Sequence, residues 1–366
     1  MLTLIQSHPA SLGPHSGAGQ AVGVTVINFN TAKQTLRCIA SLGACTEPPA
    51  WIEVLDNASE PNDISQLQIQ LPTLPHTQIR LYRSETNLGF AAGSNQLIEK
   101  LLQTPQCQYI GLLNNDAVAQ ANWVTELVGT LSSAPQQQGC AGGRMHQLEK
   151  PDQVDTLGIS LYASLMPADR HALQDPFLGP TGGCCLMTRA FVKDIIQSTG
   201  YLFDERYFCY CEDTDLALRA NLLGYRPGYT DQLIALHEGQ ASSKGGYNQF
   251  IAYHGLRNTI WMHLKLMPTQ LLWRHGLGLL LAHLMSIARH TLSGHPALMW
   301  RVYRDALKQW PQFRQERQQL QLVSRIQTHQ LHAQVAHRFY RAGYLSLVLK
   351  QLFSAIFKIG KPVSSS

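Results

Sequence analysis

The stretch YIGLLNNDAVAQANW, residues 109–123, decides the fold class of this chain. Five residues with the composition of a buried strand run directly into Asn114, Asn115 and Asp116, and a segment with helical character follows. A strand-to-helix turn would explain the three polar residues, because Asn and Asp tolerate unusual backbone angles and cap helices well. A ligand site at the end of a strand would explain them equally, and the remaining sequence has to separate the two interpretations.

The same strand-then-helix pattern repeats along residues 22–143. Short apolar runs alternate with amphipathic segments, and the runs are VGVTVI, WIEVL, QIRLY, QYIGLL and GCAGG. This alternation predicts an α/β fold with a doubly wound, mostly parallel sheet, in which ligands bind at the carboxyl ends of the strands. Polar clusters stand at four of these ends: Asn28–Asn30, Asp56–Ser59, Asn87–Gly89 and Asn114–Asp116. Four such clusters favour a binding site over four unrelated turns.

The charge of the chain is divided unevenly. Its 366 residues are 45% hydrophobic, which predicts a globular protein with a sizeable core. The net charge of +5 combines −7 over residues 1–264 with +12 over residues 265–366. A basic C-terminal region predicts an anionic partner: a membrane surface, a phosphate-bearing lipid or a nucleic acid.

Several protein classes are disfavoured by missing motifs. The eight cysteines include no C-x-x-C pair, which argues against a zinc site and is typical of reduced thiols in the cytosol. The first strand lacks G-x-G-x-x-G, which argues against a dinucleotide-dependent dehydrogenase. The N-terminus has no basic start followed by an apolar run, so we expect residues 1–21 to be a flexible leader rather than a signal peptide.

The second half of the chain has a weaker pattern. Residues 144–180 look like loops, whereas TGGCCLMTRAF, residues 181–191, predicts a glycine-rich loop that enters a strand. A helix is expected after Cys211, and Glu212, Asp213 and Asp215 fall in its first turn, where capping of the helix dipole would explain them. A last short strand, LIAL, ends at His237.

Beyond residue 247 the chain is expected to be helical and cationic. The uncharged run 275–288 has 14 residues, too few to span a bilayer as one helix. Residues 341–361 place Leu, Val, Phe and Ile on one stripe with Lys around it. That pattern predicts a helix at a membrane interface, or a helix that packs on the core of a C-terminal bundle.

Taken in order, seven segments resemble glycosyltransferase family 2 of the GT-A type, and more narrowly its bacterial rhamnosyltransferase-like branch in cell-envelope polysaccharide synthesis. The segments are VINFN, LDNASE, NLGFAAGSN, LLNNDA, TGGCCLMTR, FDERYFCYCEDTDLALR and ALHEG. The resemblance covers residues 22–265 and implies a GT-A catalytic domain with a Rossmann-like mixed sheet. Its nucleotide-sugar half would be residues 22–143 and its acceptor half residues 144–265, followed by a basic helical region, residues 266–366, that is membrane-associated or packed on the core.

The resemblance implies an inverting transfer of a sugar from a nucleoside-diphosphate donor to a glycan or lipid-linked acceptor. Negative charge grows on the diphosphate as the glycosidic bond breaks, and GT-A enzymes usually place a divalent cation there through a D-x-D motif. Asp116 would bind Mg²⁺ or Mn²⁺, with Asn114 in the place of the first Asp, where an amide adds no charge. His237 would supply a further ligand, although a structural histidine is the alternative.

The donor would lie across the first strands. The carboxylate of Asp56 can accept the N3 proton of uracil or thymine, although an Asx-turn would also explain it. Small residues at Gly89 and Gly93 permit tight packing near the donor. The expected donor-binding residues are Asn28, Asn30, Asp56, Asn87, Gly89, Asn95, Asn114, Asn115 and Asp116.

The acceptor side would carry the base. Asp213 matches the family's general base, which takes the proton of the attacking hydroxyl, and Glu212 stands beside it as a neighbour or acceptor contact. Thr181, Gly182 and Gly183 would form the floor under both substrates. Arg257 would meet a phosphate, although an ion pair or a contact with backbone carbonyls would explain it equally.

A catalytically silent sugar-nucleotide-binding or scaffold protein could share the fold, but the acidic set is present in full. The basic tail flanks Leu-rich stripes rather than interleaved aromatics, so no nucleic-acid partner is expected. We favour dTDP-rhamnose or a UDP-sugar as donor. We expect a cytoplasmic protein, with the basic tail holding it at the anionic cytoplasmic face of the inner membrane.

Overall fold

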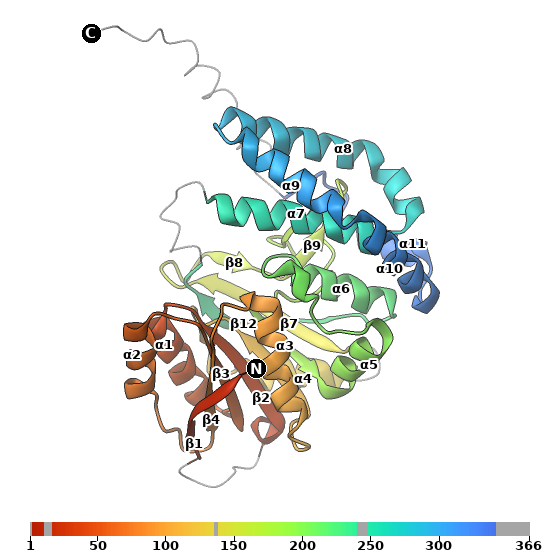
Figure 1. The fold of residues 1–366 in the computed structure, drawn as a ribbon. Helices are drawn as coiled ribbons and strands as arrows, with labels where there is room; N and C mark the ends of the chain where they lie inside the picture. Colours follow the sequence, from red (N-terminus) through yellow and green to blue (C-terminus); the bar gives the residue numbers. More distant parts are fainter. Residues whose placement is uncertain (1, 11–16, 135–137, 240–247, 342–366) are drawn as a thin grey trace, which may run out of the picture.

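A computed structural model of the chain describes residues 2–10, 17–134, 138–239 and 248–341. These residues form a sheet with helices on both faces, and a layer of helices stacked at one end of it (Figure 1). The strands of the main sheet are β1 (Thr3–His8), β2 (Val22–Asn28), β3 (Trp51–Asn57), β4 (Gln78–Ser84), β5 (Tyr109–Leu113), β6 (Ala117–Ala119), β7 (Cys140–Gln147), β8 (Val154–Thr156), β11 (Cys184–Thr188) and β12 (Gly228–His237). Two further strands, β9 (Ile159–Leu161) and β10 (Pro167–Asp169), form a separate antiparallel pair.

The main sheet is mixed, with a parallel centre. Its order is β1-β4-β3-β2-β5-β11-β7-β12-β6, and β8 pairs with β7. Strands β4, β3, β2 and β5 run parallel, which brings their carboxyl ends to one edge and sets Asn28 opposite Asp56. Strand β11 runs antiparallel between β5 and β7. The predicted parallel sheet is confirmed for the first half of the chain, and the mixed character comes from the second half.

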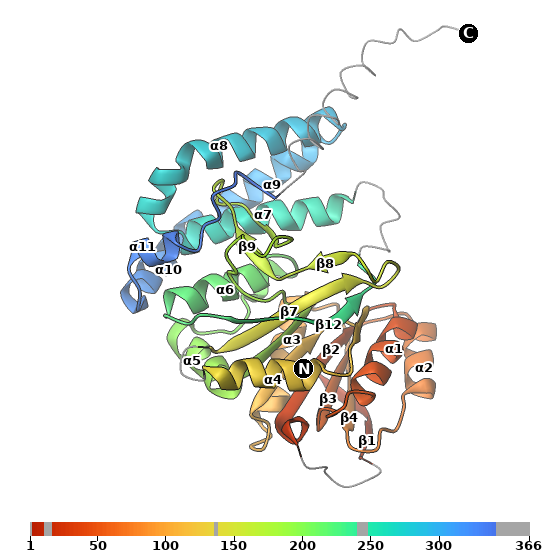
Figure 2. The same ribbon diagram turned by 180° about the vertical axis from the view of Figure 1, so that it is seen from behind.

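Two hydrophobic clusters hold helices against the two faces of the sheet. The helices of this part are α1 (Ala32–Gly43), α2 (Pro61–Gln70), α3 (Gly89–Leu102), α4 (Trp123–Ser133), α5 (Arg189–Thr199) and α6 (Glu212–Leu222), with short 3₁₀ turns at Ala18–Ala21 and Glu205–Tyr207. Side chains of α1, α2 and α4 share one cluster with β2, and those of α3, α5 and α6 share the other (Figures 1 and 2). The alternation of apolar runs and amphipathic segments therefore gives the layered arrangement that it predicts.

The N-terminal expectation needs a correction. Residues Thr3–His8 form β1, which pairs antiparallel with β4 at the edge of the sheet, so this part is not a flexible leader. An edge strand offers unpaired backbone N–H and C=O groups, and those of β4 bind the N-terminal segment. Residues 144–180, expected as loops, contain the end of β7 and the three short strands β8, β9 and β10.

The helical layer consists of the elements after residue 247. They are α7 (Gln249–Leu266), α8 (Thr269–Leu292), α9 (Pro296–Lys308), α10 (Trp310–Val323) and α11 (Thr328–His332). Met262, Leu266 and Leu271 share a hydrophobic cluster with Leu218 and Leu222 of α6, so the layer packs on the half of the molecule that carries α6. The amphipathic segment expected at residues 341–361 lies outside the described residues, apart from Arg341.

A buried network of charges joins the helical layer to α6. The Nζ atom of Lys265, at the end of α7, lies 2.7 Å from Oδ2 of Asp204 and also pairs with Asp215. The Nε atom of Arg219 lies 2.7 Å from Oδ1 of Asp215. All four side chains are buried, so each charge depends on its partners rather than on water. The network fixes α6 against α7.

Candidate active site

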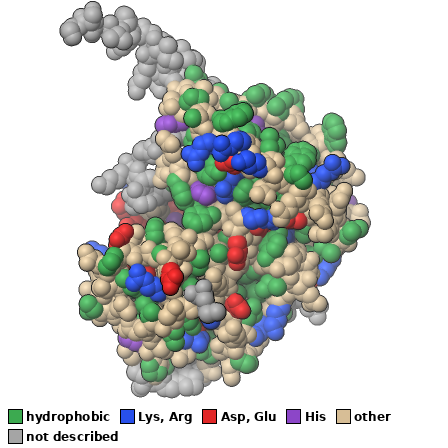
Figure 3. Space-filling model, viewed as in Figure 1, with side chains coloured by type: hydrophobic (Ala, Val, Ile, Leu, Met, Phe, Trp, Pro, Cys, Tyr) green, Lys and Arg blue, Asp and Glu red, His purple; other side chains and the backbone are tan. Residues whose placement is uncertain are grey.

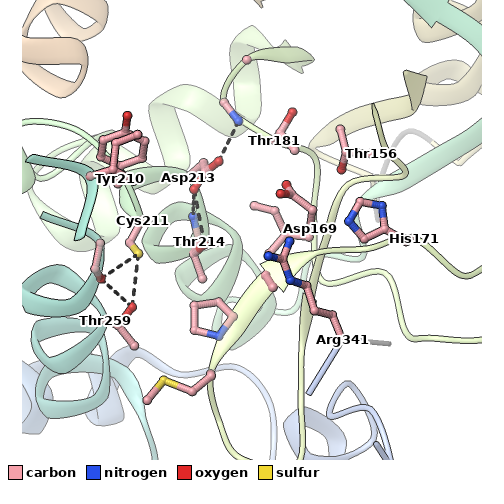
Figure 4. A pocket seen from close by; sticks show the side chains of 18 of the residues that line it. Thr156, Asp169, His171, Thr181, Tyr210, Cys211, Asp213, Thr214, Thr259 and Arg341 are labelled. Carbon is pink, nitrogen blue, oxygen red and sulfur yellow. Dashed lines mark hydrogen bonds between the residues drawn. The ribbon is translucent and has the colours of Figure 1, made fainter. Parts of the chain in front are cut away.

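A cavity of about 870 Å³ lies between the carboxyl edge of the sheet and the helical layer. Its wall on the sheet side includes Asn114, which follows β5, and His237, the last residue of β12. The loop at residues 181–183 and the start of α6 form its floor, and Leu256 and Met285 of the helical layer close the other side. Figure 4 shows Asp213 and Thr181 near each other at this cavity, with Tyr210 and Asp169 on either side.

The chain enters α6 through a strained loop, residues 208–211, which we call the α6 entry loop. Phe208, Tyr210 and Cys211 have φ angles of 65°, 68° and 66°, in the left-handed region that non-glycine residues rarely adopt. Such strain persists only where surrounding contacts over-determine the backbone, and it clusters at functional sites. The loop sets the position of Glu212 and Asp213, because these residues follow it directly.

Two helices supply the contacts that hold this loop. The backbone N–H groups of Phe90 and Ala91, at the start of α3, donate to the carbonyl of Phe208 at 2.7 and 3.1 Å. From α7, the side-chain amide of Asn258 donates to the carbonyls of Cys209 at 2.8 Å and Tyr210 at 2.7 Å. The loop is therefore fixed from α3 and from α7 at once.

Gly89 is required at the start of α3. Its φ is 74°, and a Cβ atom there would lie 2.5 Å from the carbonyl oxygen of Phe208. Any side chain would push α3 away from the α6 entry loop. The sequence-based expectation of close packing at Gly89 is thus met by a protein contact with this loop.

Asp213 faces the cavity and is held by backbone donors. Its Oδ2 accepts a hydrogen bond from the N–H of Gly182 at 3.0 Å, and its Oδ1 accepts one from the N–H of Thr214 at 2.6 Å (Figure 4). Burial raises the pKa of Asp213 above its ordinary value of 3.8, although these hydrogen bonds oppose the rise. A carboxylate with a raised pKa in a fixed orientation is suited to accept a proton.

Glu212 lies beside Asp213 with one carboxyl oxygen unpaired. Its side chain is 6% exposed, and Oε2 has no hydrogen-bond partner among the described residues. Burial raises the pKa of Glu212 well above 4.5, and the charge of Asp213 adds to the rise. The unpaired oxygen of Glu212 is thus placed to make a hydrogen bond with a ligand in the cavity.

A chain of two carboxylates and one imidazole stands at the sheet edge. The Nε2 atom of His237 lies 3.2 Å from Oδ1 of Asp116, and Nδ1 lies 2.8 Å from Oδ2 of Asp155. Burial opposes a charge on the ring, but the hydrogen bonds to Asp116 and Asp155 outweigh it and raise the pKa of His237 to about 10. The N–H of Glu238 donates to the backbone carbonyl of Asp116 at 3.0 Å, which ties β12 to the turn after β5.

The donor set of this chain fits a divalent cation. A cation would have to displace the proton from Nε2 of His237; with Nδ1–H donated to Asp155, the ring would then present the Nε2 lone pair toward Asp116, the arrangement in which a carboxylate behind a histidine orients a metal ligand. Among the described residues, no group of three or more His, Cys, Asp and Glu side chains surrounds a common point. A cation here would therefore depend on oxygens of a substrate and water, which Mg²⁺ and Mn²⁺ accept readily.

Gly182 and Gly183 lie between Asn114 at the sheet edge and Asp213 at the start of α6. A Cβ atom on Gly182 would lie 3.3 Å from Cβ of Asp213, and one on Gly183 would lie 2.8 Å from Nδ2 of Asn114. The backbone N–H of Asn114 also donates to the carbonyl of Gly183 at 2.8 Å. Asn114 and Asp213 thus lie on either side of a two-residue segment, and both line the same cavity. Asp116 reaches that cavity through its contact with His237.

Asp56 and Asn28 lie side by side at the ends of their strands, and both are fully buried. The side-chain amide of Asn28 donates to Oδ1 of Asp56 at 3.1 Å and to Ser59 at 3.0 Å. The Oδ2 atom of Asp56 has no hydrogen-bond partner in the described part of the chain, although Nε of Arg83 lies 3.5 Å away. Asp56 is not among the described residues that line the cavity, so a contact between its carboxylate and a nucleotide stays a prediction.

Other predicted donor-binding residues hold the loops of this edge. The backbone N–H of Asn30 donates to Ser59 at 2.9 Å, and Oδ1 of Asn87 accepts from the N–H of Gly89 at 2.8 Å. Asn95 donates to the carbonyl of Phe203 at 2.9 Å. These contacts join neighbouring turns, and a contact with a donor stays a prediction for the three asparagines.

Asn115 and Arg257 also make internal contacts. Asn115 donates to the hydroxyl of Thr35 at 3.0 Å, which ties the turn after β5 to α1. The guanidinium of Arg257 donates to Oδ1 of Asn258 at 2.8 Å and to the carbonyl of Tyr207 at 3.3 Å. Neither residue is among the described residues that line the cavity. Arg257 thus makes the contact with a backbone carbonyl that the sequence allowed, and a contact with a phosphate stays a prediction.

Four ionisable residues of the cavity were missed by the sequence analysis. Asp155, Asp169, His171 and Arg341 line it, and Figure 4 shows the last three grouped together. Burial raises the pKa of Asp169, and the charge of His171 opposes the rise. No spacing motif marks these residues, because they come from the loop-rich segment 144–180 and from the end of the helical layer.

The comparisons agree with one another on the class of protein. Residues 24–196 match the family Glycosyl transferase family 2. The chain is 26% identical over 255 residues to the N-acetylglucosaminyl-diphospho-decaprenol L-rhamnosyltransferase of Mycobacterium tuberculosis, which covers 61% of this chain and 77% of that protein. It is 34% identical over 62 residues to Rhamnosyltransferase WbbL of Escherichia coli, which covers 17% of this chain and 23% of WbbL.

Two solved structures share the fold. One is a mannosyltransferase from Pyrobaculum calidifontis in complex with GDP-Man and Mn²⁺, with a TM-score of 0.50, 14% identity and coverage of 86% of this chain and 89% of that one. The other is GalNAc-T7 with UDP, GalNAc and Mn²⁺, with a TM-score of 0.51, 13% identity and coverage of 81% and 56%. At these identities the likeness shows the fold alone.

Proposed function

Since residues 24–196 belong to glycosyltransferase family 2 and the fold is of the GT-A type, we propose that this protein is an inverting, metal-assisted sugar transferase. The donor is a nucleoside-diphosphate sugar, with dTDP-rhamnose favoured over UDP-sugars because two relatives are rhamnosyltransferases. One observation carries the proposal: Asn114 and Asp213 stand on either side of Gly182–Gly183 and line one cavity, with His237 and Asp116 at the same edge.

The nucleotide binds at the ends of β2 and β3. Asp56 accepts the N3–H of uracil or thymine through Oδ2, which has no hydrogen-bond partner in the described part of the chain and lies 3.5 Å from Nε of Arg83, while Asn28 donates to Oδ1. The sugar diphosphate then extends along the sheet edge toward Asn114.

Asp116 and His237 would hold Mg²⁺ or Mn²⁺, with Asp155 orienting the ring of His237. The cation supplies positive charge for the diphosphate as it leaves. Asn114 adds an amide oxygen without charge, so more of the cation's coordination falls to the substrate and water.

The reaction is a single displacement at the anomeric carbon. Asp213 takes the proton of the acceptor hydroxyl as the new C–O bond forms, and its raised pKa favours this uptake. Glu212 makes a hydrogen bond with the acceptor through Oε2, which has no partner among the described residues. Because the hydroxyl attacks from the face opposite the leaving diphosphate, the anomeric configuration inverts and no covalent sugar–enzyme species is needed.

The acceptor occupies the part of the cavity under the helical layer. That part combines apolar side chains such as Leu256 and Met285 with the guanidinium of Arg341 and the imidazole of His171, which suits a glycan carried on an anionic lipid. The mycobacterial relative is named for a diphospho-decaprenol acceptor, in accord with this choice. We therefore place the protein in the cytoplasm, acting at the cytoplasmic face of the inner membrane in polysaccharide synthesis.

A panel of nucleotide sugars tests the proposal. Purified protein is incubated with each donor, a lipid-linked saccharide and Mg²⁺ or Mn²⁺, and transfer is measured with and without EDTA. We expect turnover with one donor class, its loss on chelation, and an inverted product by NMR. Donor-dependent thermal stabilisation without turnover on any acceptor would instead support a sugar-nucleotide-binding protein that lacks activity.

A further inference from the structure

Helix α8 presents a row of apolar side chains to solvent along its whole length. The spacing of three and four residues places them on one face of the helix. Trp273 is 84% exposed and Leu277 is 72% exposed, which is unusual for side chains of this size. The row, which we call the α8 outer row, consists of Trp273, Leu277, Leu280, Leu281, Leu284 and Ile287.

The opposite face of α8 is the one that packs on the protein. Leu271, Ala282 and Ser286 on that face are buried, yet only 17% of the most apolar 18-residue window of α8 is buried. A core helix in a water-soluble protein has the reverse distribution, with its apolar face inward. A contiguous exposed apolar surface of this kind marks an interaction site.

Helix α8 has the length and composition to cross a membrane, but its contacts fit a helix lying in the membrane plane. Nδ1 of His275 is within 2.7 Å of the carbonyl of Ala163, and Nδ1 of His283 is within 2.9 Å of the hydroxyl of Tyr303. Surrounding the helix with lipid would break these polar contacts without replacement. With the inner face kept on the protein, lipid can meet the outer row alone.

The charges around the outer row match an anionic surface. Residues 265–366 carry 14 Lys and Arg against 2 Asp and Glu, and α8 itself has no acidic residue. Neighbouring α9 packs along α8 and adds Trp300, which is 70% exposed, next to Arg301. Hydrophobic side chains and a group of Lys and Arg gather over the helical layer in Figure 3. Aromatic and basic residues around an apolar stripe are typical of interfacial helices.

The same helix also forms a wall of the cavity. Its inner residues Ala282, Met285 and Ser286 line the space that Asp213 lines from the other side. A lipid bound at the outer row is therefore one helix thickness away from the acceptor part of the cavity, about 10 Å.

We propose that the α8 outer row, with Trp300 of α9, docks the protein in the plane of an anionic bilayer, so that a lipid-linked acceptor enters the cavity along the inner face of α8. The docking partner is the bilayer surface itself, recognised by apolar insertion and by cationic residues around the row. The identity of the acceptor rests on the proposed function, whereas docking is a property of the surface and is measured without turnover.

Flotation of the full chain with lipid vesicles tests the docking. We compare vesicles of phosphatidylethanolamine and phosphatidylglycerol with vesicles of phosphatidylcholine, using the wild type and the variants Leu277→Asp and Leu280→Asp. The control is Ile69→Asp on α2, an exposed apolar residue at 83% exposure on the sheet part of the molecule. We expect binding to the anionic vesicles, a loss of about tenfold or more for each α8 variant, and no loss for the control.

Further outcomes separate this proposal from the proposed function. With unchanged melting temperatures, the α8 variants are expected to transfer sugar normally to a detergent-dispersed acceptor and slowly to one embedded in vesicles. Equal binding of wild type and α8 variants to vesicles would overturn the docking surface and leave the transferase intact. A wild-type dimer that Leu280→Asp converts to a monomer, without vesicle binding, would assign the row to self-association and also overturn it.

Discussion

The two walls of the cavity are held in different ways. On the sheet wall polar side chains are positioned by protein partners, as in the contacts of His237 with Asp116 and Asp155. The helical wall contributes apolar side chains such as Met285, and the outer face of the same helix meets solvent. Fixed polar groups suit a reaction whose charges appear at defined atoms, whereas an apolar wall suits a bulky partner that is recognised by surface area. We therefore expect substitutions on the sheet wall to impair catalysis or metal binding, and substitutions on the outer face of the helical wall to impair docking to a partner.

The largest effect is expected for Asp213→Asn. The amide keeps the size of the side chain and cannot take the proton of the acceptor, so kcat should fall by about 10²–10⁴-fold. Donor affinity, measured by calorimetry, should stay within a few-fold of the wild type. A variant that folds, binds donor and transfers at the normal rate would remove Asp213 from the role of base.

Lys265→Met tests the buried charge network that joins α7 of the helical layer to α6. Removing the cation leaves Asp204 and Asp215 buried together with Arg206 and Arg219 as their remaining partners, so the free energy of unfolding should drop by about 3 kcal/mol, the lower end of the range for a broken buried pair. Chemical denaturation measures the change. The control is Arg325→Met, which breaks a solvent-exposed pair with Asp194 and should cost about 0–1 kcal/mol. Equal losses in the two variants would mean that the buried network does not hold the layers together.

Asp155→Asn tests whether Asp155 strengthens His237 as a metal ligand at the sheet wall. The amide can still accept from Nδ1–H of His237, but it lacks the charge that strengthens the ligand, so Mn²⁺ affinity should fall by about 10–100-fold. The measurement is Mn²⁺ binding in the presence of nucleoside diphosphate. Asp169→Asn changes a carboxylate in the same cavity that makes no contact with His237, and it should leave the Mn²⁺ affinity unchanged.

The change of kcat with pH near neutrality should be the smallest of the expected effects. Burial raises the pKa of Asp213, so the fraction of deprotonated base, and with it kcat, should rise as pH increases through that value. Below it, the rate should fall by about tenfold per pH unit. The rate is followed under saturating donor, with donor binding measured in parallel. A flat profile down to the ordinary pKa of 3.8 for Asp would contradict a raised value.

The sequence predicts the sheet wall far better than the helical wall. Strand ends such as Asn28 and Asp56 are marked by apolar runs that stop abruptly, and the glycines at residues 182–183 are marked by their composition. The contacts that Asn115 and Arg257 make within the protein could not be predicted from the sequence, because the residue type does not show whether an amide or a guanidinium binds a ligand or another protein group. Asp155 carries no motif, since its role depends on a register between β7 and β8 set by tertiary packing.

The helical layer was predicted as a basic bundle, but its extent was not. The uncharged run 275–288 is part of the 24-residue helix α8, which extends through Arg274 and Arg289 because basic side chains are good helix formers. Strand β1 was missed for a related reason. Six residues with mixed polarity form a strand because β4 has a free edge, and an isolated sequence does not display its partner.

The α6 entry loop has a consequence for how the chain matures. The conformation of the loop depends on contacts with Phe90 and Ala91 from α3 and with Asn258 from α7. These segments are more than 160 positions apart in the sequence, and both must pack on the loop before Asp213 has its final orientation. Contacts of such long sequence separation form late, since the chain must first be brought together across the intervening loop. A nascent polypeptide that ends after α6 would contain both Asp116 and Asp213, but the α6 entry loop would lack its contacts with Asn258. The carboxylate of Asp213 would reach its final position only when α7 docks on the α6 entry loop.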